Sequence, residues 1–349
     1  MKIDIKIIET DDDYQSCLFI RKQVFIIGQN IPVEIELDDD KINAANHMNS
    51  CIKILNEEHS HISESDLYKT RLIGIQTSPI TTIQDSDSSM LRSKQLTTHP
   101  NFAAYIVELF HESELSNGDT IAVSMTGSFP GANLALLSAC EVMNIKPIII
   151  SSVGSSSWGA NREELSWLDM ELYLYDKGGI HFKSLASSIG GKDDLGSQIS
   201  EKGVENIEEI IGSKNIELVN KENLELNISR KIEIYNNHKK VSDYKAYINI
   251  GGGVASIGPG DGKKSLKAGI ISPLEKNKIQ YEGFSNSMAK IFLDKGVTFI
   301  NIKNINLLAK SAGLYPPDKS IKINEGSLFY LEKNITVFLL IRNETSLST

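Results

Sequence analysis

Residues 120–161 constrain the fold most, because two apolar runs in this segment each break into a loop of small polar residues. The first run, Thr120 to Val123, gives way to Ser124–Ser128, and an apolar, Ala-rich helical segment follows from Ala132 to Met143. The β-branched run Ile148–Ile150 then leads into a second polar loop, Ser151–Ser157, and is typical of a strand buried on both faces. Parallel strands joined by a right-handed helical crossover bring both loops to the carboxyl edge of a sheet, where α/β proteins bind ligands.

The rest of the chain repeats this alternation. A short strand is expected from Arg71, an amphipathic helix from about Pro100, and further strands at Ala246–Ile250 and in the GVTFINIKN segment. The predicted fold class is α/β, with a mostly parallel, Rossmann-like sheet flanked by helices and a short N-terminal α/β extension. The predicted divisions are an N-terminal fragment at 1–47, a connector at 48–70 and the α/β domain at 71–349.

The loops at the strand ends predict an anion site. Hydroxyls and unpaired amides at a helix N-terminus favour a carboxylate or phosphate, and three glycines after a strand let the backbone approach a ligand. We expect the helix that begins near Gly131 to present its amides to such an anion. The predicted ligand-binding residues are Ser124, Thr126, Gly127, Ser128, Ser151, Ser152, Ser155, Asn161, Gly251, Gly252 and Gly253.

Catalytic residues are not assigned by the sequence. Ser128 lacks the flanking glycines of a nucleophile elbow, and the candidate bases His99, His111 and His181 have no diagnostic spacing. The glycines from Gly251 onward form neither a P-loop nor a dinucleotide fingerprint, so no cofactor is predicted. His59 and His61 lie in a polar segment with no further ligand at suitable spacing, so no metal site is predicted.

The charge balance argues against a nucleic-acid partner. The 349 residues include 36 basic and 45 acidic side chains, for a net charge of −9. Three cysteines are too few for a disulfide framework, and the acidic start resembles no signal peptide. No apolar run approaches the length of a bilayer span, so the sequence predicts a cytoplasmic chain.

Two family resemblances cover different parts of the chain. The N-terminal stretch IRKQVFIIGQNIPVEIELD resembles the opening of GNAT acetyltransferases over about the first 47 residues, although no pyrophosphate-binding signature of that family follows. The motifs LIGIQTSPITT, LRSKQLTTHPNFAA, GDTIAVSMTGSFPGANLALLSA, KPIIISSVGSSSWGAN and YINIGGGVASIG, spread over about residues 48–314, resemble the poly-gamma-glutamate system protein family.

That second resemblance implies a role in making or exporting poly-gamma-glutamate, a bacterial capsule polymer. The expected partners are the polymer or another glutamate-type ligand, together with the polymer ligase and export proteins. Members of that family generally begin with a membrane anchor, whereas this chain has the GNAT-like stretch there. Three functions remain open: an accessory component that binds the polymer, an amide hydrolase or transferase that acts on it, and an acetyltransferase.

Overall fold

The computed structural model describes residues 37–58, 62–86 and 88–330. The chain divides into two compact units, Asp40–Leu328 and a smaller unit that combines Met1–Asp39 with Phe329–Thr349. In the described part of the smaller unit, an isolated antiparallel bridge joins Leu37 to Tyr330. The larger unit holds the sheet and every predicted ligand-binding residue.

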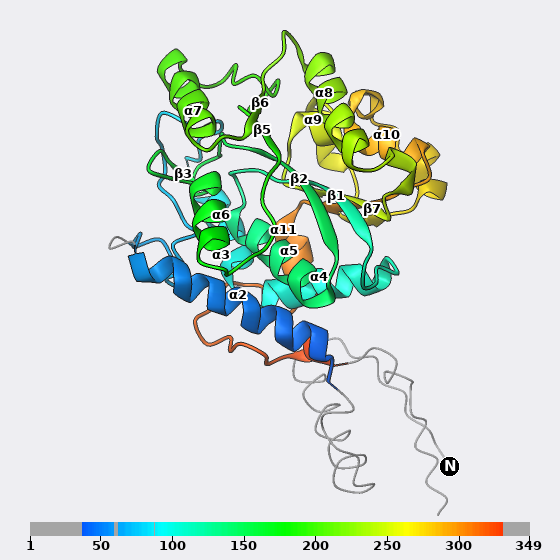
Figure 1. Cartoon of the computed structure of the whole chain (residues 1–349). Coiled ribbons are helices and arrows are strands. Elements are labelled where there is room, and N and C mark those ends of the chain that lie inside the picture. The colour runs from blue at the N-terminus through cyan, green and yellow to red at the C-terminus, as the bar shows by residue number, and fades with distance from the viewer. Residues whose placement is uncertain (1–36, 59–61, 87, 331–349) are drawn as a thin grey trace, which may run out of the picture. The chain divides into compact units, whose positions relative to one another are not determined.

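A seven-stranded sheet in the order β6-β5-β2-β1-β7-β9-β8 forms the centre of the larger unit (Figure 1). All its strands are parallel except β8, which pairs antiparallel with β9. This confirms the predicted mostly parallel α/β class. The strands are β1 (Thr120–Ser124), β2 (Lys146–Ser152), β5 (Ala186–Ser188), β6 (Glu217–Val219), β7 (Ala246–Ile250), β8 (Gly269–Ile271) and β9 (Thr298–Ile302).

The strand order reverses at β1. From β1 the chain proceeds to β2, β5 and β6 on one side, and it then returns to place β7 and β9 on the other side. Helix α5 (Pro130–Met143) makes the crossover from β1 to β2, as the Ala-rich segment predicts. Open α/β sheets bind ligands beyond the carboxyl ends of the strands at such a switch point.

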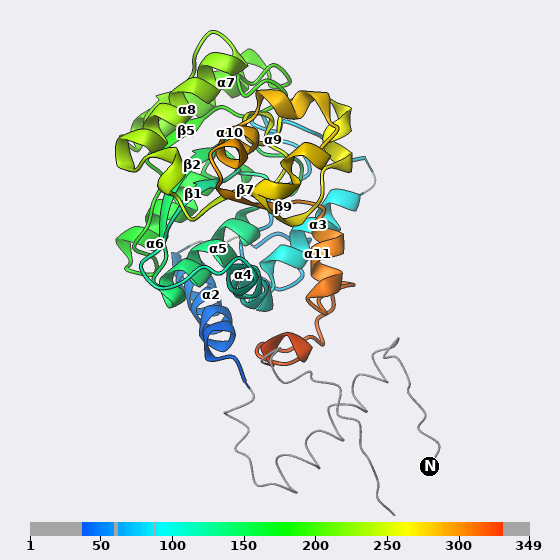
Figure 2. The ribbon, with the colours of Figure 1, turned by 90° about the vertical axis from the view of Figure 1, so that its right-hand side faces the viewer.

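Alternate residues of the strands enter two hydrophobic layers, one on each face of the sheet. Figure 2 shows the helices that cover the two faces. Ile121 and Val123 of β1 pack in one layer, whereas Ala122 packs in the other, among aromatic residues such as Tyr247. The first layer contains α3 (Ser89–Thr98), α4 (Asn101–Glu112), α5, α6 (Trp167–Asp176) and α11 (Ile305–Ser311). The second contains α8 (Leu224–His238), α9 (Val254–Ile257) and α10 (Met288–Asp294), while α7 (Glu201–Ser213) joins a third cluster.

Short elements complete the larger unit. The hairpin of β3 (Asn161–Arg162) and β4 (Leu165–Ser166) lies outside the main sheet and leads into α6. Short 3-10 turns occupy Val241–Asp243, Asp261–Ser265, Pro273–Lys278 and Glu282–Asn286, and a last one spans Ser327–Phe329.

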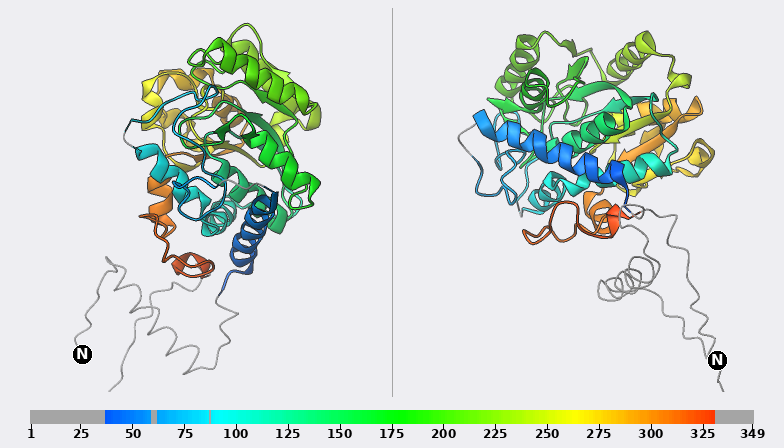
Figure 3. Two further views of the ribbon diagram at one scale, coloured as in Figure 1. Left: turned by 90° about the vertical axis from the view of Figure 1, so that its left-hand side faces the viewer. Right: turned by 60° about the horizontal axis from the view of Figure 1, so that its bottom comes forward.

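Helix α2 (Asp39–Glu58) crosses the boundary that the sequence predicts at residue 47 (Figure 3). Its Met48, Cys51 and Leu55 side chains are buried in the same hydrophobic layer as α5 and α6. These apolar residues follow one another at helical spacing, so a single amphipathic face anchors the helix to the α/β unit. The first part of the expected connector, residues 48–58, is therefore a core helix.

One local expectation differs from the structure. Residues 71–75 form no strand of the sheet, because the Ile75 N–H and C=O bond to the side chain of Asn161. The polar stretch around Lys94 is helix α3, whose Lys94, Thr97 and Thr98 side chains are buried, whereas Arg92 is exposed. Most of the predicted N-terminal α/β extension and the histidines His59 and His61 lie outside the described residues.

Candidate functional site

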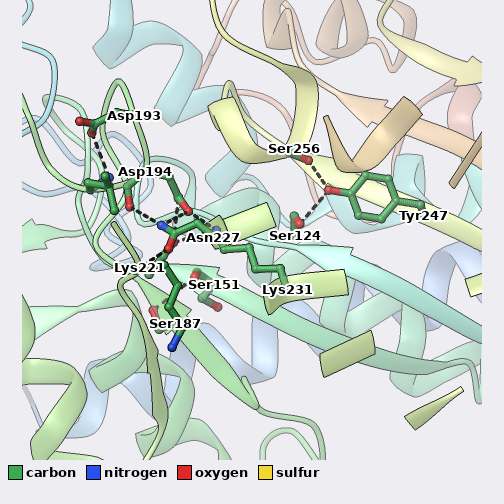
Figure 4. Close-up of polar contacts among 12 residues, drawn as sticks. Ser124, Ser151, Ser187, Asp193, Asp194, Lys221, Asn227, Lys231, Tyr247 and Ser256 are labelled. Atoms are coloured by element: carbon green, nitrogen blue, oxygen red, sulfur yellow. Dashed lines mark hydrogen bonds and ion pairs between the residues drawn. The ribbon is translucent and has the colours of Figure 1, made fainter. Parts of the chain in front are cut away.

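A small polar cavity of about 20 Å³ lies at the switch point, beyond the carboxyl ends of β1, β2 and β7. This volume is enough for one water molecule or the end of a larger ligand. Figure 4 shows the polar side chains around it. Its lining residues are Ser124, Met125, Thr126, Ile150, Ser151, Ser152, Asp194, Lys231, Asn249, Ile250, Gly253, Ala255, Ser256 and Met288.

Lys231 of α8 brings a buried ammonium group to this cavity. Its Nζ donates to Asp194 Oδ2 at 2.6 Å and to Ser188 Oγ at 2.9 Å. The Asp194 carboxylate is in turn held by Asn227 Nδ2 at 3.0 Å and by the Ser188 hydroxyl at 2.8 Å. An ammonium group has three N–H donors, so Lys231 retains one beyond the two bonds found in the described part of the chain.

Asn249 of β7 supplies the complementary acceptor. Its Nδ2 donates to Gly251 O at 2.7 Å and to Asn301 Oδ1 at 2.9 Å, and these two acceptors fix the orientation of the amide. Its Oδ1 is buried and has no hydrogen-bond partner among the described residues. An unpaired buried carbonyl is costly, so Asn249 favours a bound donor in the cavity.

Tyr247 contacts two serines of the cavity lining from behind. Its hydroxyl lies 2.8 Å from Ser124 Oγ and also forms a short hydrogen bond with Ser256 Oγ. Burial raises the pKa of Tyr247, against hydrogen bonds from Ser124 and Ser256 that lower it, so the phenol stays protonated. The side chains of Ser124 and Ser256 are therefore held in place by a neutral donor and acceptor.

A chain of hydroxyls connects the cavity to a buried carboxyl group. Ser151 Oγ bonds to Ser184 Oγ, and Ser184 donates its hydroxyl to Glu171 Oε1 at 3.0 Å and its N–H to Oε2 at 2.8 Å. Burial raises the pKa of Glu171 to about 7, although the bonds from Ser184 act in the opposite direction. The Ser151 hydroxyl is thus linked, through one intervening hydroxyl, to a group that titrates near neutral pH.

Five predicted ligand-binding residues line this cavity, namely Ser124, Thr126, Ser151, Ser152 and Gly253. The other six predicted residues do not line it. Gly251 has φ +85°, and a Cβ there would lie 2.8 Å from Thr126 Cγ2, whereas the Gly252 carbonyl accepts from Lys263 Nζ at 3.2 Å. The glycine segment therefore lies close to the first serine loop, as its composition predicts.

Gly127, Ser128 and Ser155 tie the two serine loops together. Gly127 donates its N–H to Ser152 O at 2.8 Å, and its carbonyl accepts the Ser155 hydroxyl at 3.0 Å. Ser128 Oγ accepts from the Ser156 N–H at 3.0 Å. A Cβ on Gly127 would lie 2.3 Å from Val153 O, so this loop contact requires glycine.

Asn161 has a structural position, away from the cavity lining. Its Oδ1 accepts from the Ile75 N–H at 2.9 Å, and its Nδ2 donates to Ile75 O at 2.8 Å and to Thr81 Oγ1 at 3.0 Å. The Asn161 side chain thus uses both of its N–H donors and its carbonyl oxygen to hold residues 75–81. Asn161 was expected to donate a hydrogen bond to the ligand, but both of its N–H donors bond to Ile75 and Thr81.

The first turn of α5 also faces the protein. A Cβ on Gly131 would lie 2.6 Å from Thr97 O at the end of α3, so α3 packs directly against the start of this helix. None of Pro130, Gly131 or Ala132 lines the cavity. The cationic group at the cavity is instead Lys231, on helix α8 of the other hydrophobic layer.

Sequence reasoning did not find Asp194, Lys231 or Asn249. Lys231 lies in a polar helix in which surface lysines are the ordinary expectation, and only the fold makes it buried. Asn249 had a detectable signal, because AYINI and TFINI each place an asparagine in an apolar strand. These two asparagines, Asn249 and Asn301, are register partners in β7 and β9.

Within residues 37–58, 62–86 and 88–330, no helix has the length and apolar character needed to cross a membrane. No protein-family model, curated protein or solved structure matches the chain.

Proposed function

We propose that the chain binds a glutamate-type carboxylate ligand at the switch-point cavity, as an accessory component of poly-gamma-glutamate synthesis or export. The observation that carries this proposal is the pairing of a buried ammonium, Lys231, with an unpartnered carbonyl, Asn249 Oδ1, in one cavity. A carboxylate takes the remaining N–H of Lys231, and an amide or ammonium N–H of the same ligand bonds to Asn249. The polymer itself is inferred from the motifs of residues 48–314.

The surrounding hydroxyls support an anionic ligand. Ser152 is half-buried and its hydroxyl makes no side-chain hydrogen bond within the described residues, so it can donate to a carboxylate. Hydrogen bonds to a charged group contribute about 1.5–3 kcal/mol each. A ligand that bonds to Lys231 and Ser152 therefore gains enough to order the loops around the cavity.

Calorimetric titration with glutamate and short gamma-linked glutamate oligomers tests the proposal. Ser152→Ala should weaken binding about tenfold or more, because it removes one donor to the charged group. The exposed Ser213→Ala on α7 is the matched control and should bind like the wild type. Lys231→Met should abolish binding, provided that circular dichroism shows a native fold despite the unpaired Asp194. Equal affinities for wild type and Ser152→Ala, or no binding by the wild type, would refute the proposal.

A further inference from the structure

A second cluster, outside the cavity, joins a lysine to the serine loops. Lys94 of α3 is buried, and its Nζ lies 2.9 Å from Ser156 Oγ and 3.5 Å from the centroid of the Phe129 ring. The N–H of the same Ser156 donates to Ser128 Oγ at 3.0 Å. Three segments that are distant in the sequence thus place an amine and two hydroxyls together.

We propose that Ser156, Lys94 and Ser128 form a serine–lysine acyl-transfer centre that hydrolyses amides or esters. Ser156 is the nucleophile and Lys94 is its general base, since the two groups are in direct hydrogen-bond contact. Ser128 Oγ accepts a bond from Ser156 and donates none within the described residues, so its own proton is available to a developing oxyanion. The preferred substrate is a gamma-glutamyl amide, and this last point alone rests on the proposed function.

The surroundings of Lys94 suit a base. Burial lowers the pKa of Lys94 to about 7, against the nearby Asp85 carboxylate, which raises it. A substantial fraction of the amine is therefore neutral at physiological pH and can accept a proton. Ser156 is buried but retains 6% exposure, and the neighbouring Ser128 is half-buried and therefore the more accessible hydroxyl of the two.

The reaction balances with water as the only co-reactant. Neutral Lys94 takes the hydroxyl proton of Ser156 while Oγ bonds to the acyl carbon, and the C–N bond breaks as Lys94 returns that proton to the leaving nitrogen. Water then attacks the seryl ester and gives a proton to Lys94. The ester C–O bond breaks, the proton returns to Ser156 Oγ, and a carboxylic acid and an amine are released.

Covalent labelling with a small alkyl fluorophosphonate tests the centre without any glutamate ligand. The full-length chain should form a single adduct, mapped to Ser156 by peptide mass spectrometry, at a rate that rises with pH around 7. Lys94→Met should slow labelling about 100-fold or more, because general-base assistance is lost, and Lys94→Arg, which keeps the charge but cannot act as a base, should be equally unreactive. Lys303→Met is the matched control, since Lys303 is another lysine whose pKa burial lowers, to about 8, and labelling should not change.

The labelling of each variant decides for or against the centre when circular dichroism shows that the variant has a native fold. An adduct on Ser156 that depends on Lys94 supports the centre, even if glutamate oligomers fail to bind. The absence of a Ser156 adduct in the wild type, or equal labelling of Lys94→Met, overturns it and leaves the switch-point cavity unaffected. Ser156→Ala verifies the position of the adduct.

Discussion

Ser184 gives both of its hydrogen-bond donors to Glu171, the backbone N–H at 2.8 Å and the hydroxyl at 3.0 Å. This arrangement holds a carboxyl group in the core that still has a pKa of about 7. The same Ser184 hydroxyl contacts Ser151 at the cavity wall. Protonation of Glu171 is therefore coupled both to folding and to the site.

Glu171→Gln should change how stability depends on pH. The pKa of Glu171 is about 7 in the folded protein, against an ordinary value of 4.5 for a glutamate in water, so the folded state binds more protons between these values. Wild-type stability should therefore fall as the pH rises from about 4.5 to about 7. The glutamine variant should lack this decrease in urea unfolding at pH 5, 6, 7 and 8. The exposed Glu209→Gln should follow the wild type, and parallel profiles for Glu171→Gln and wild type would contradict the assignment.

Lys94→Met should remove a rise in stability at higher pH, whereas Glu171→Gln removes a fall. The folded protein releases the Lys94 proton near pH 7, whereas the unfolded chain keeps it until about 10.5. Wild-type stability should thus increase between these pH values, and the methionine variant should lose that increase. Exposed Lys53→Met serves as the control, and chemical unfolding between pH 7 and 10 makes the measurement. A wild-type profile that is flat over this range would show that Lys94 has an ordinary pKa.

Gly127→Ala should destabilise the protein by about 1–3 kcal/mol, the usual cost of overpacking. The added methyl group would meet Val153 O at 2.3 Å and separate the two serine loops. Gly212→Ala in α7 is the matched control, because a Cβ there meets nothing within 4 Å. That control should stabilise the helix by about 0.5–1 kcal/mol. Thermal unfolding of both variants measures the difference in stability. Similar shifts in Tm for the two variants would contradict the close contact between Gly127 and Val153.

Asn161→Ala should reduce stability while leaving ligand affinity intact. It deprives the Ile75 N–H of its partner, while the Ile75 C=O keeps the Trp158 N–H, and an unsatisfied buried donor costs about 1–3 kcal/mol. The exposed Asn220→Ala should have little effect. Urea unfolding together with titration of the folded variant separates the two roles. A stable Asn161→Ala with weakened binding would restore Asn161 as a ligand donor.

Local sequence patterns predicted the elements that depend on periodicity. The predicted strands ending in Ser124 and Ile250 and the crossover helix to Met143 occur where expected, because apolar runs and small-residue loops fix them directly. The carboxyl-edge location of the serine loops followed from the parallel connection. Helix α3 was missed because Lys94 reads as a solvated residue, and only tertiary packing buries it.

The chemistry of the candidate site was less predictable. The two serine loops lie at the carboxyl edge of the sheet, where the sequence predicts them. The sequence could not distinguish, however, the serines that face the cavity from the serines that join the two loops. Ser151 and Ser155 are both buried and differ only in the direction of their hydroxyls. Lys231 reaches the cavity from more than 70 residues away, so no local pattern relates it to these serines.

The pairing of β1 with β7 joins Ile121 to Ala246, and it therefore determines when during synthesis the cavity can exist. Ser124 and Ser151 are synthesised before the cavity wall that carries Asn249, which follows Ser151 by about 100 residues. Such distant pairing forms slowly, because the intervening chain must close a large loop first. A nascent chain that ends before β7 would have both serine loops and no ligand pocket. Binding at the proposed site would consequently report that β7 has joined the sheet.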